Sequence, residues 1–388
     1  MNVHPGSSDD GWAAPPPVVL DDGTIAQLLK DGEALHAAYE AIRLARVQVC
    51  LQVYIFASDH TGQAFTDLLC RKAAEGVQVF VMYDSFGALS TDRSIFQRMR
   101  RSGVRVEEFH PVRPWECRFS WRPFNRDHRK LVVVDGQISW LGGMNIADEY
   151  AGPWVAGDKA LVRAEPWRDT AVGLRGPGTR ELLTAFKRTW RYLQHGGRIT
   201  RCQHIHDGQS IDVLATVACL NSPLRPRLKQ AFGAARDSID LTMAYFAPDD
   251  ELVAALCAAA ARGVRVRLML PSKSDMRILV TAARSFYERL LRAGVAVYER
   301  QQAILHAKTM VIDGHSSVVG STNLDYRSIE YNCELSVLIR SESFGRQMVT
   351  LFENDMRFAT RIELNRWRRR RVLDRLGQWT VSRARYLL

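Results

Sequence analysis

Apolar and polar positions along the chain follow the same order twice. Residues 45–84 read as an apolar strand, a Tyr and Phe pair, an acidic turn, an amphipathic helix, a Gly-Val step and a second apolar strand, and residues 235–271 repeat that order. A helix end followed by a strand start then recurs at 100–106 and 291–297. Strands that alternate with helices predict a parallel or mixed sheet covered on both faces. The pattern therefore predicts a duplicated α/β unit.

The duplication continues through residues 128–145 and 306–323. Each segment contains a short β-branched run, 131–134 and 310–312, that is typical of a buried strand. An Asp-Gly pair follows each run and indicates a tight turn, so each segment is predicted to be a strand with a hairpin after it. Because residues i and i+2 of a strand project to the same face, the His and Lys of each segment are expected to point together.

The two segments share one set of polar residues at fixed spacing. In both, His is followed by Lys at +2, Asp at +7, Gly at +8, Gly at +14 and Asn at +17. The set comprises His128, Lys130, Asp135 and Asn145 in the first copy and His306, Lys308, Asp313 and Asn323 in the second. A single His-x-Lys carries little information in a chain with ten histidines, but repetition of the whole set indicates one composite catalytic site.

These residue types suit attack on a phosphodiester. A neutral imidazole can act as a nucleophile and a protonated one as an acid. Lysine ammonium groups and asparagine amides can stabilise negative charge on the phosphate oxygens. The Asp of each copy completes the catalytic motif, but its odd offset turns it away from the His on an unbroken strand, which favours a role in holding the turn. With this much positive charge and no carboxylate cluster beside the histidines, we expect no metal and no other cofactor.

Composition and charge indicate a globular protein with an anionic partner. The chain has 388 residues, a net charge of +11 and a pI of about 9.5, which suggests nucleic acid, phosphorylated metabolites or an acidic lipid surface. Nine arginines against Glu363 and Asp374 fall in residues 361–388. Seven scattered cysteines without CxxC pairs predict reduced thiols in the cytosol. Residues 1–17 do not predict a signal peptide, and the longest apolar run, 252–261, is about half of a membrane-spanning length.

The chain also carries strings that are typical of a known family. They are Tyr54-Ile55-Phe56, Asn125-Arg126-Asp127-His128-Arg129-Lys130, Gly142-Gly143-Met144-Asn145, Trp167-Arg168-Asp169-Thr170, Gly320-Ser321-Thr322-Asn323-Leu324-Asp325-Tyr326-Arg327-Ser328 and Asn332-Cys333-Glu334. Through these and the two complete His-Lys-Asp copies, residues 30–388 resemble the phospholipase D superfamily. Within it the chain is most similar to the bacterial cardiolipin synthases, and to their short, peripheral form because it shows no N-terminal transmembrane helices.

The resemblance implies a fold and roles for the site residues. The fold is bilobal α/β, with two mixed β-sheets flanked by helices, related by a pseudo-two-fold axis and joined so that both motifs form one site. His128 is implied as the nucleophile and His306 as the acid. Asp169, which follows His128, and Glu334, which follows His306, are the candidates for the carboxylates that orient the two imidazoles.

The implied function is the synthesis of cardiolipin from phosphatidylglycerol and a lipid hydroxyl through a phosphohistidine intermediate. The resemblance places the protein at the cytoplasmic face of the cell membrane, attached peripherally. A hydrolase or nuclease of the same superfamily is the enzymatic alternative, and a non-catalytic membrane or nucleic-acid binder on this fold is the other. The sequence indicates neither the acceptor lipid nor the oligomeric state.

Two further segments combine basic and aromatic residues. In residues 361–388, arginines alternate with Trp, Leu and Tyr at helical spacing, which favours a basic amphipathic helix on an anionic membrane surface. A helix that docks on the protein is the alternative, and contact with nucleic acid is less favoured. Residues 113–124 lead into His128 and fit equally a flap that meets acyl chains and a packed loop.

The expected organisation has four parts. They are a polar tail over 1–22, a first phospholipase D-like half over 23–200, a second half over 201–360 with a linker near 196–210, and the basic segment over 361–388.

Overall fold

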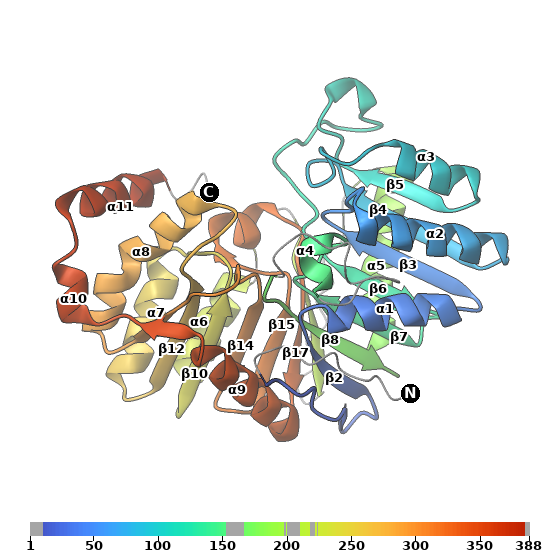
Figure 1. The fold of residues 1–388 in the computed structure, drawn as a ribbon. Coiled ribbons are helices and arrows are strands. Elements are labelled where there is room, and N and C mark those ends of the chain that lie inside the picture. The colour runs from blue at the N-terminus through green and yellow to red at the C-terminus, as the bar shows by residue number, and fades with distance from the viewer. Residues whose placement is uncertain are drawn as a thin grey trace.

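Two similar α/β halves lie side by side, each built on an eight-stranded sheet (Figure 1). The computed structural model describes residues 11–152, 167–197, 199, 210–217, 222 and 224–384. The sheets are mixed and flanked by helices, which confirms the predicted fold class.

The first sheet has the strand order β1-β2-β8-β7-β6-β3-β4-β5. Its strands are β1 (Val18–Val19), β2 (Ile25–Lys30), β3 (Gln48–Val53), β4 (Gln78–Asp84), β5 (Arg105–Phe109), β6 (Leu131–Val134), β7 (Ile138–Gly142) and β8 (Thr170–Arg175). Strands β3, β4 and β5 are parallel to one another, and the other neighbours pair antiparallel.

The second sheet has the order β18-β13-β12-β10-β14-β15-β17-β9. Its strands are β9 (Ile211–Ala215), β10 (Ser238–Met243), β12 (Arg265–Pro271), β13 (Ala296–Arg300), β14 (Lys308–Ile312), β15 (Ser316–Gly320), β17 (Leu335–Arg340) and β18 (Ala359–Arg361), while β11 (Phe246–Ala247) pairs with β16 (Leu324–Asp325). The run β13-β12-β10-β14-β15-β17-β9 repeats β5-β4-β3-β6-β7-β8-β2 of the first sheet. The duplication predicted from the hydrophobic pattern is therefore confirmed strand by strand.

Helices cover the sheets at equivalent places in the two halves. They are α1 (Glu33–Leu44), α2 (His60–Ala74), α3 (Ser94–Arg101), η1 (Pro114–Glu116), α4 (Asp148–Ala151), α5 (Thr179–His195), α6 (Leu224–Ala234), α7 (Asp250–Ala261), α8 (Arg277–Arg292), η3 (Arg327–Tyr331), α9 (Glu342–Met356), α10 (Leu364–Arg368) and α11 (Val372–Ala384). The repeated acidic turn of the sequence forms the helix N-caps, since Asp59 accepts from Gly62 N in α2 and Asp249 from Leu252 N in α7. Within the described part of the chain, no helix combines the length and apolarity that crossing a bilayer requires.

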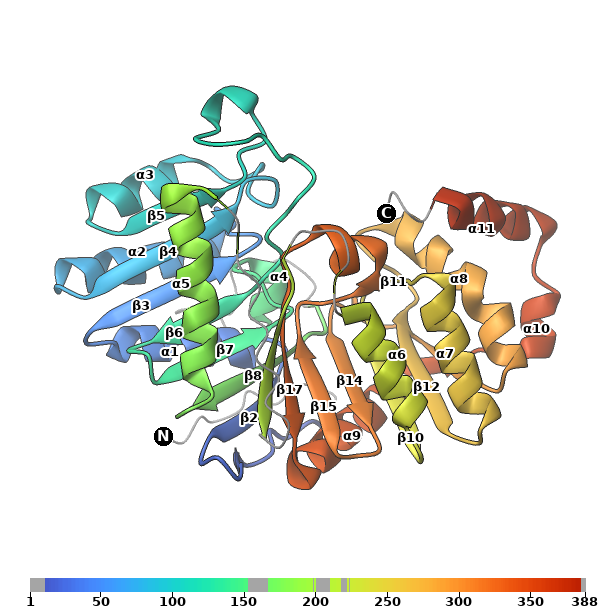
Figure 2. The same ribbon diagram turned by 180° about the vertical axis from the view of Figure 1, so that it is seen from behind.

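One hydrophobic cluster holds the halves together. It contains residues of both sheets, including Val133 and Val172 from the first and Val319 and Val337 from the second. Strands β7 and β8 contact β15 and β17, and Figure 2 shows these strands meeting at the centre of the molecule. The molecule therefore has a continuous core where two separate domains would have an open interface.

The chain ends differ in part from the expected organisation. The tail was expected to be polar over residues 1–22, but Trp12 and Leu20 are buried and β1 extends the first sheet, because apolar side chains in this segment reach the shared core. Residues 1–10 and most of the expected linker lie outside the described residues. At the other end, α10 and α11 pack on α8, with the ring of Trp367 at 5.0 Å from that of Tyr287.

Candidate active site

The two His-x-Lys motifs lie where the halves meet, at the beginning of β6 and β14. His128 and Lys130 immediately precede β6, and Lys308 is the first residue of β14, so the histidines stand just before the strands on which they were predicted. Each histidine is held by the other half through its backbone. His128 N donates to Cys333 O at 2.9 Å, and His306 N donates to Arg168 O at 2.8 Å.

The carboxylate partners of the histidines are exchanged between the halves. Glu334, at the start of β17, lies 3.1 Å from Nδ1 of His128, and Asp169, at the start of β8, lies 2.8 Å from Nδ1 of His306. Both candidate residues are thus at the site, but the pairing suggested by their order along the chain is reversed. The physical reason is that the two backbone bonds across the interface, to Cys333 O and Arg168 O, place the residue that follows each carbonyl beside the histidine of the other half.

The contact with Glu334 fixes the tautomer of His128. Because a carboxylate only accepts, Nδ1 of His128 carries the ring proton and Nε2 keeps its lone pair. Burial lowers the pKa of His128 despite the neighbouring Glu334 carboxylate. Burial opposes ionisation of Glu334, but His128, Lys130 and the hydroxyl of Ser321, which donates at 2.5 Å, together lower the pKa of its carboxyl.

Burial shifts the pKa values of the second pair, His306 and Asp169, still more strongly. It lowers the pKa of His306 well below its usual value, and the charges of Lys308, Lys130 and His128 add to this effect. Burial also raises the pKa of Asp169 to about 6, against the lowering influence of Lys308. His306 is therefore neutral near pH 7, and a negative charge placed beside it would raise its pKa.

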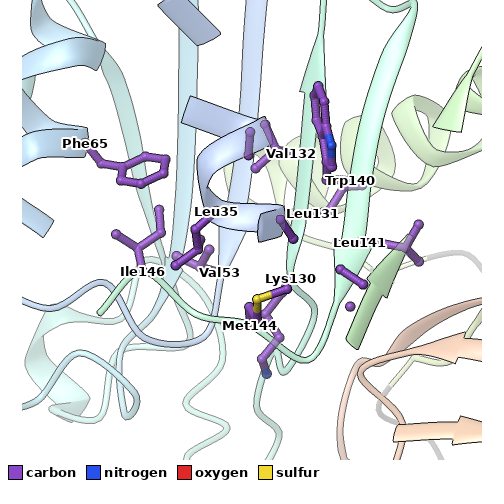
Figure 3. Close-up of a pocket in the computed structure, with 14 residues that line it drawn as sticks. Leu35, Val53, Phe65, Lys130, Leu131, Val132, Trp140, Leu141, Met144 and Ile146 are labelled. Atoms are coloured by element: carbon purple, nitrogen blue, oxygen red, sulfur yellow. The ribbon is translucent and has the colours of Figure 1, made fainter. Parts of the chain in front are cut away.

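Both lysines are buried beside the two histidines. Burial lowers the pKa of Lys130 to about 7 and that of Lys308 to about 8. The stem of Lys130 lines an apolar cavity of about 40 Å³, and Figure 3 shows its ammonium end pointing away from Leu35, Val53 and Ile146. This cavity has room for about one water molecule and not for an acyl chain.

The aspartates of the motif are not at the site. The carboxylate of Asp135 accepts the backbone N–H groups of Arg46, Val47 and Gln48, and Asp313 accepts those of residues 236–238. Both aspartates have positive φ, 50° and 53°, at the hairpin after β6 or β14. Each aspartate therefore holds its turn, because its carboxylate joins the hairpin to the start of the neighbouring strand.

The two asparagines make contacts that support the backbone around the site. Asn145 Oδ1 accepts from Ile55 N at 3.0 Å while its Nδ2 donates to the hydroxyl of Tyr150 at 2.9 Å, and Asn323 Oδ1 accepts from Tyr245 N at 3.3 Å. These bonds fix the segments that follow β3 and β10.

Two tyrosines that follow those strands were not singled out as site residues. The ring of Tyr54 lies 5.1 Å from that of His128, and Lys130 Nζ lies 5.2 Å from its centroid. Tyr245 occupies the equivalent place beside His306 and Lys308, and its hydroxyl donates to Asp275. The recurrence of Tyr after the first strand of each repeat was the signal that could have identified both.

The site also departs from symmetry beside the two carboxylates. Ser321 follows β15 and donates to Glu334, whereas Gly143 stands at the same place after β7. A Cβ on Gly143 would lie 2.3 Å from an oxygen of Asp169, so only glycine leaves room for that carboxylate. The two halves thus hold carboxylates of different length by different means, and the two histidines are not chemically equivalent.

These pKa values predict that anion binding is coupled to proton uptake. We expect diethyl phosphate, whose single charge is fixed between pH 6 and 9, to bind most tightly below pH 7, where Lys130 is already charged. Above that pH the affinity should fall by up to about tenfold per pH unit for each proton taken up. Calorimetry in buffers of different ionisation enthalpy measures the uptake directly. A constant affinity from pH 6 to 9 without proton uptake would contradict the assignment of buried, partly deprotonated cations.

Comparison with solved structures defines the fold. Phosphatidylserine synthase from Haemophilus influenzae Rd KW20 superposes with a TM-score of 0.71 at 14% identity, over 94% of this chain and 95% of that one. Polyphosphate kinase from Porphyromonas gingivalis gives a TM-score of 0.59 at 16% identity, over 88% of this chain and 49% of that one. Both likenesses show that the chain has the fold that these two enzymes share.

Comparison of this sequence with protein families and with known relatives shows the family of the chain. Residues 39–151 and 228–356 match the family described as cardiolipin synthase, PLD-like domain. Cardiolipin synthase A of Pseudomonas putida (strain GB-1) is 36% identical over 358 residues, covering 90% of this chain and 72% of that protein. Cardiolipin synthase A of Pseudomonas aeruginosa (strain LESB58) is 35% identical over 357 residues, covering 90% and 71%. The chain belongs to the cardiolipin synthase family.

Proposed function

We propose that this enzyme transfers the phosphatidyl group of phosphatidylglycerol to the hydroxyl of a second lipid, which yields cardiolipin and releases glycerol. The observation that carries the proposal is the exchanged pair of His–carboxylate contacts, in a chain of the cardiolipin synthase family. One histidine with a free lone pair and one that can be recharged by an anion are what a two-step transfer needs.

In the first step Nε2 of His128 attacks phosphorus and the bond to the glycerol oxygen breaks. The negative phosphodiester raises the pKa of His306 on binding, so His306 can give its proton to the leaving oxygen. In the second step His306 takes the proton of the incoming lipid hydroxyl, whose oxygen attacks phosphorus and releases His128. Lys130 and Lys308 neutralise the non-bridging oxygens in both steps, and Glu334 stabilises the positive charge on His128 as the phosphohistidine forms.

The asparagines have a supporting part in this proposal. Asn145 and Asn323 hold the backbone at Ile55 and Tyr245, and with it the tyrosine rings beside the two histidines. A remaining amide N–H of either side chain would be available to a phosphate oxygen. No metal and no other cofactor enters either step.

We also propose that the protein works at the cytoplasmic face of the membrane and contacts anionic lipid through α11. Val372, Leu373, Leu376 and Trp379 are exposed along one face of this helix, and arginines flank it. Both helices of the basic segment pack on α8, α10 with Trp367 against Tyr287, and in α11 the four apolar residues remain exposed. Exposed apolar residues beside arginines suit an anionic head-group layer.

The test of the proposed function is a product analysis with labelled phosphatidylglycerol in mixed micelles. We expect labelled cardiolipin and free glycerol to appear together with the wild-type enzyme and to be absent with His128→Ala. Phosphatidic acid without cardiolipin would show that water is the acceptor and that the enzyme is a hydrolase. Absence of lipid turnover, with cleavage of single-stranded DNA, would favour the nuclease alternative.

A further inference from the structure

Large exposed hydrophobic side chains gather at the end of the sheets that carries the two His-x-Lys motifs. In the segment after β5, Trp115 is 79% exposed, Phe124 is 72% exposed, and Phe119 and Trp121 are also exposed. This segment had been predicted as either a flap or a packed loop. Its exposed rings exclude the packed loop, and it ends four residues before His128.

Two other segments add exposed apolar residues at the same end of the sheets. Phe86 and Leu89 follow β4, and Met276 and Ile278 follow β12. Strands β4, β5 and β12 are parallel to β3 or β10, so their carboxyl ends share one edge of each sheet with the starts of the antiparallel strands β6 and β14. Those starts carry the His-x-Lys motifs. Figures 1 and 2 show η1 at the upper tip of the molecule, the same end at which α11 lies.

Exposed apolar side chains are few at the other end among the described residues. Val19, Leu44 and Val47 are the large hydrophobic residues exposed there. Val47 immediately precedes β3, and its N–H binds Asp135 in the hairpin at the far end of β6. The apolar exposure is therefore concentrated at the end that carries the two His-x-Lys motifs and is not a general property of the surface.

The charge of these segments complements an anionic surface. Arg113, Arg118 and Arg122 stand against the single Glu116 in the segment after β5, and Lys273 and Arg277 against Asp275 in the segment after β12. Trp121 Nε1 donates to Val112 O at 3.1 Å, which fixes an indole whose ring remains exposed. Tryptophan and arginine together are typical of protein surfaces that lie in the head-group layer of a membrane.

We propose that these three segments, 113–124, 86–89 and 273–278, form a rim that docks on an anionic lipid bilayer at the end of the sheets that carries the His-x-Lys motifs. The rim belongs to both halves, so docking turns this end of the molecule toward the head-group layer, where the phosphodiester of a phospholipid lies. The inference deepens the proposed function, on which its choice of a bilayer rests. According to this inference the substrate reaches the site from the bilayer on which the rim is docked. Helix α11 is a second contact with the bilayer at the same end of the molecule.

The test is equilibrium sedimentation with vesicles, which measures binding without any turnover. The rim variant carries Trp115→Ser, Trp121→Ser and Phe124→Ser, and the matched control carries Leu44→Ser and Val47→Ser at the opposite end. We expect wild type and control to bind phosphatidylglycerol-containing vesicles equally, and the rim variant to bind at least about tenfold more weakly. Pure phosphatidylcholine vesicles should bind the wild type more weakly. All replaced side chains are exposed, so equal thermal unfolding of the three proteins verifies their folding.

Unchanged vesicle binding by the rim variant would overturn the proposal, and so would an equal loss in the control. Loss of binding to single-stranded DNA, with vesicle binding intact, would assign the rim to nucleic acid instead. A third variant, Leu373→Ser, Leu376→Ser and Trp379→Ser, measures the share of α11 in the same assay. If vesicle binding depends on the rim but the protein makes no cardiolipin, the proposed function fails and this inference stands. The two failures can therefore be told apart.

Discussion

His128→Ala should lower the rate of phosphodiester transfer by about 10⁴-fold, the largest effect that we expect from a single side chain in this protein. The reason is that His128 has a depressed pKa and a carboxylate partner, Glu334, that holds the proton on Nδ1 and leaves Nε2 free. Its removal takes away the atom that bonds to phosphorus. The backbone bond to Cys333 does not involve the side chain, so the fold should persist.

A p-nitrophenyl phosphodiester distinguishes the two histidines, because this leaving group needs no proton. With His306→Ala we expect a burst of one p-nitrophenolate per enzyme and a phosphorylated protein that turns over slowly. With His128→Ala we expect neither a burst nor phosphorylated protein. The reverse pattern would assign the nucleophile to His306 and its Asp169 partner. Absence of phosphorylated enzyme in both variants, with activity retained in His306→Ala, would contradict the two-step mechanism.

Asp355→Ala should have the largest effect on stability, a loss of about 3–5 kcal/mol in the free energy of unfolding. Asp355 lies in α9 and is fully buried, and it binds Arg168 of the first half at 2.8 Å through both carboxylate oxygens. It also binds Arg300 at 3.4 Å. Its removal leaves two buried guanidinium groups without their shared carboxylate. Denaturant unfolding followed by circular dichroism measures the loss.

The matched control for Asp355 is Arg346→Ala in the same helix. Arg346 and Glu342 form an ion pair at 3.3 Å with both side chains more than half exposed, so its loss should cost about 0–1 kcal/mol. Because the carbonyl of Arg168 binds His306 N, and Asp169 follows it, Asp355→Ala should also lower activity below the unfolding transition. Equal stability of the two variants would show that the buried pair does not connect the halves.

Much of the site could be predicted because the chain repeats itself. Two copies of one spaced motif identify His128, Lys130, His306 and Lys308 without any structure, since chance does not reproduce such spacing twice. The odd offset of Asp135 from its histidine correctly indicated a residue turned toward the hairpin, because side chains alternate along a strand. The duplicated α/β unit followed from the same periodicity, whereas the strand order of the sheets came from the structure.

The pairing of each imidazole with a carboxylate could not be predicted in this way. Order along the chain placed Asp169 with His128 and Glu334 with His306, whereas the packing of the two sheets at the interface exchanges them. The burial of Trp12 in the N-terminal tail could not be predicted for a similar reason, because the residues that pack around it are distant in sequence. Such contacts depend on how two sheets pack and leave no local pattern.

The sequence by itself determined the duplicated α/β unit, the four cationic or nucleophilic residues and the family, because periodicity and motif spacing are local properties of a chain. The tertiary structure decided which carboxylate serves which histidine, how far burial shifts each pKa, and that the apolar rim and the site lie at the same end. These depend on distance and on the exclusion of water, which arise only when the two halves close on each other.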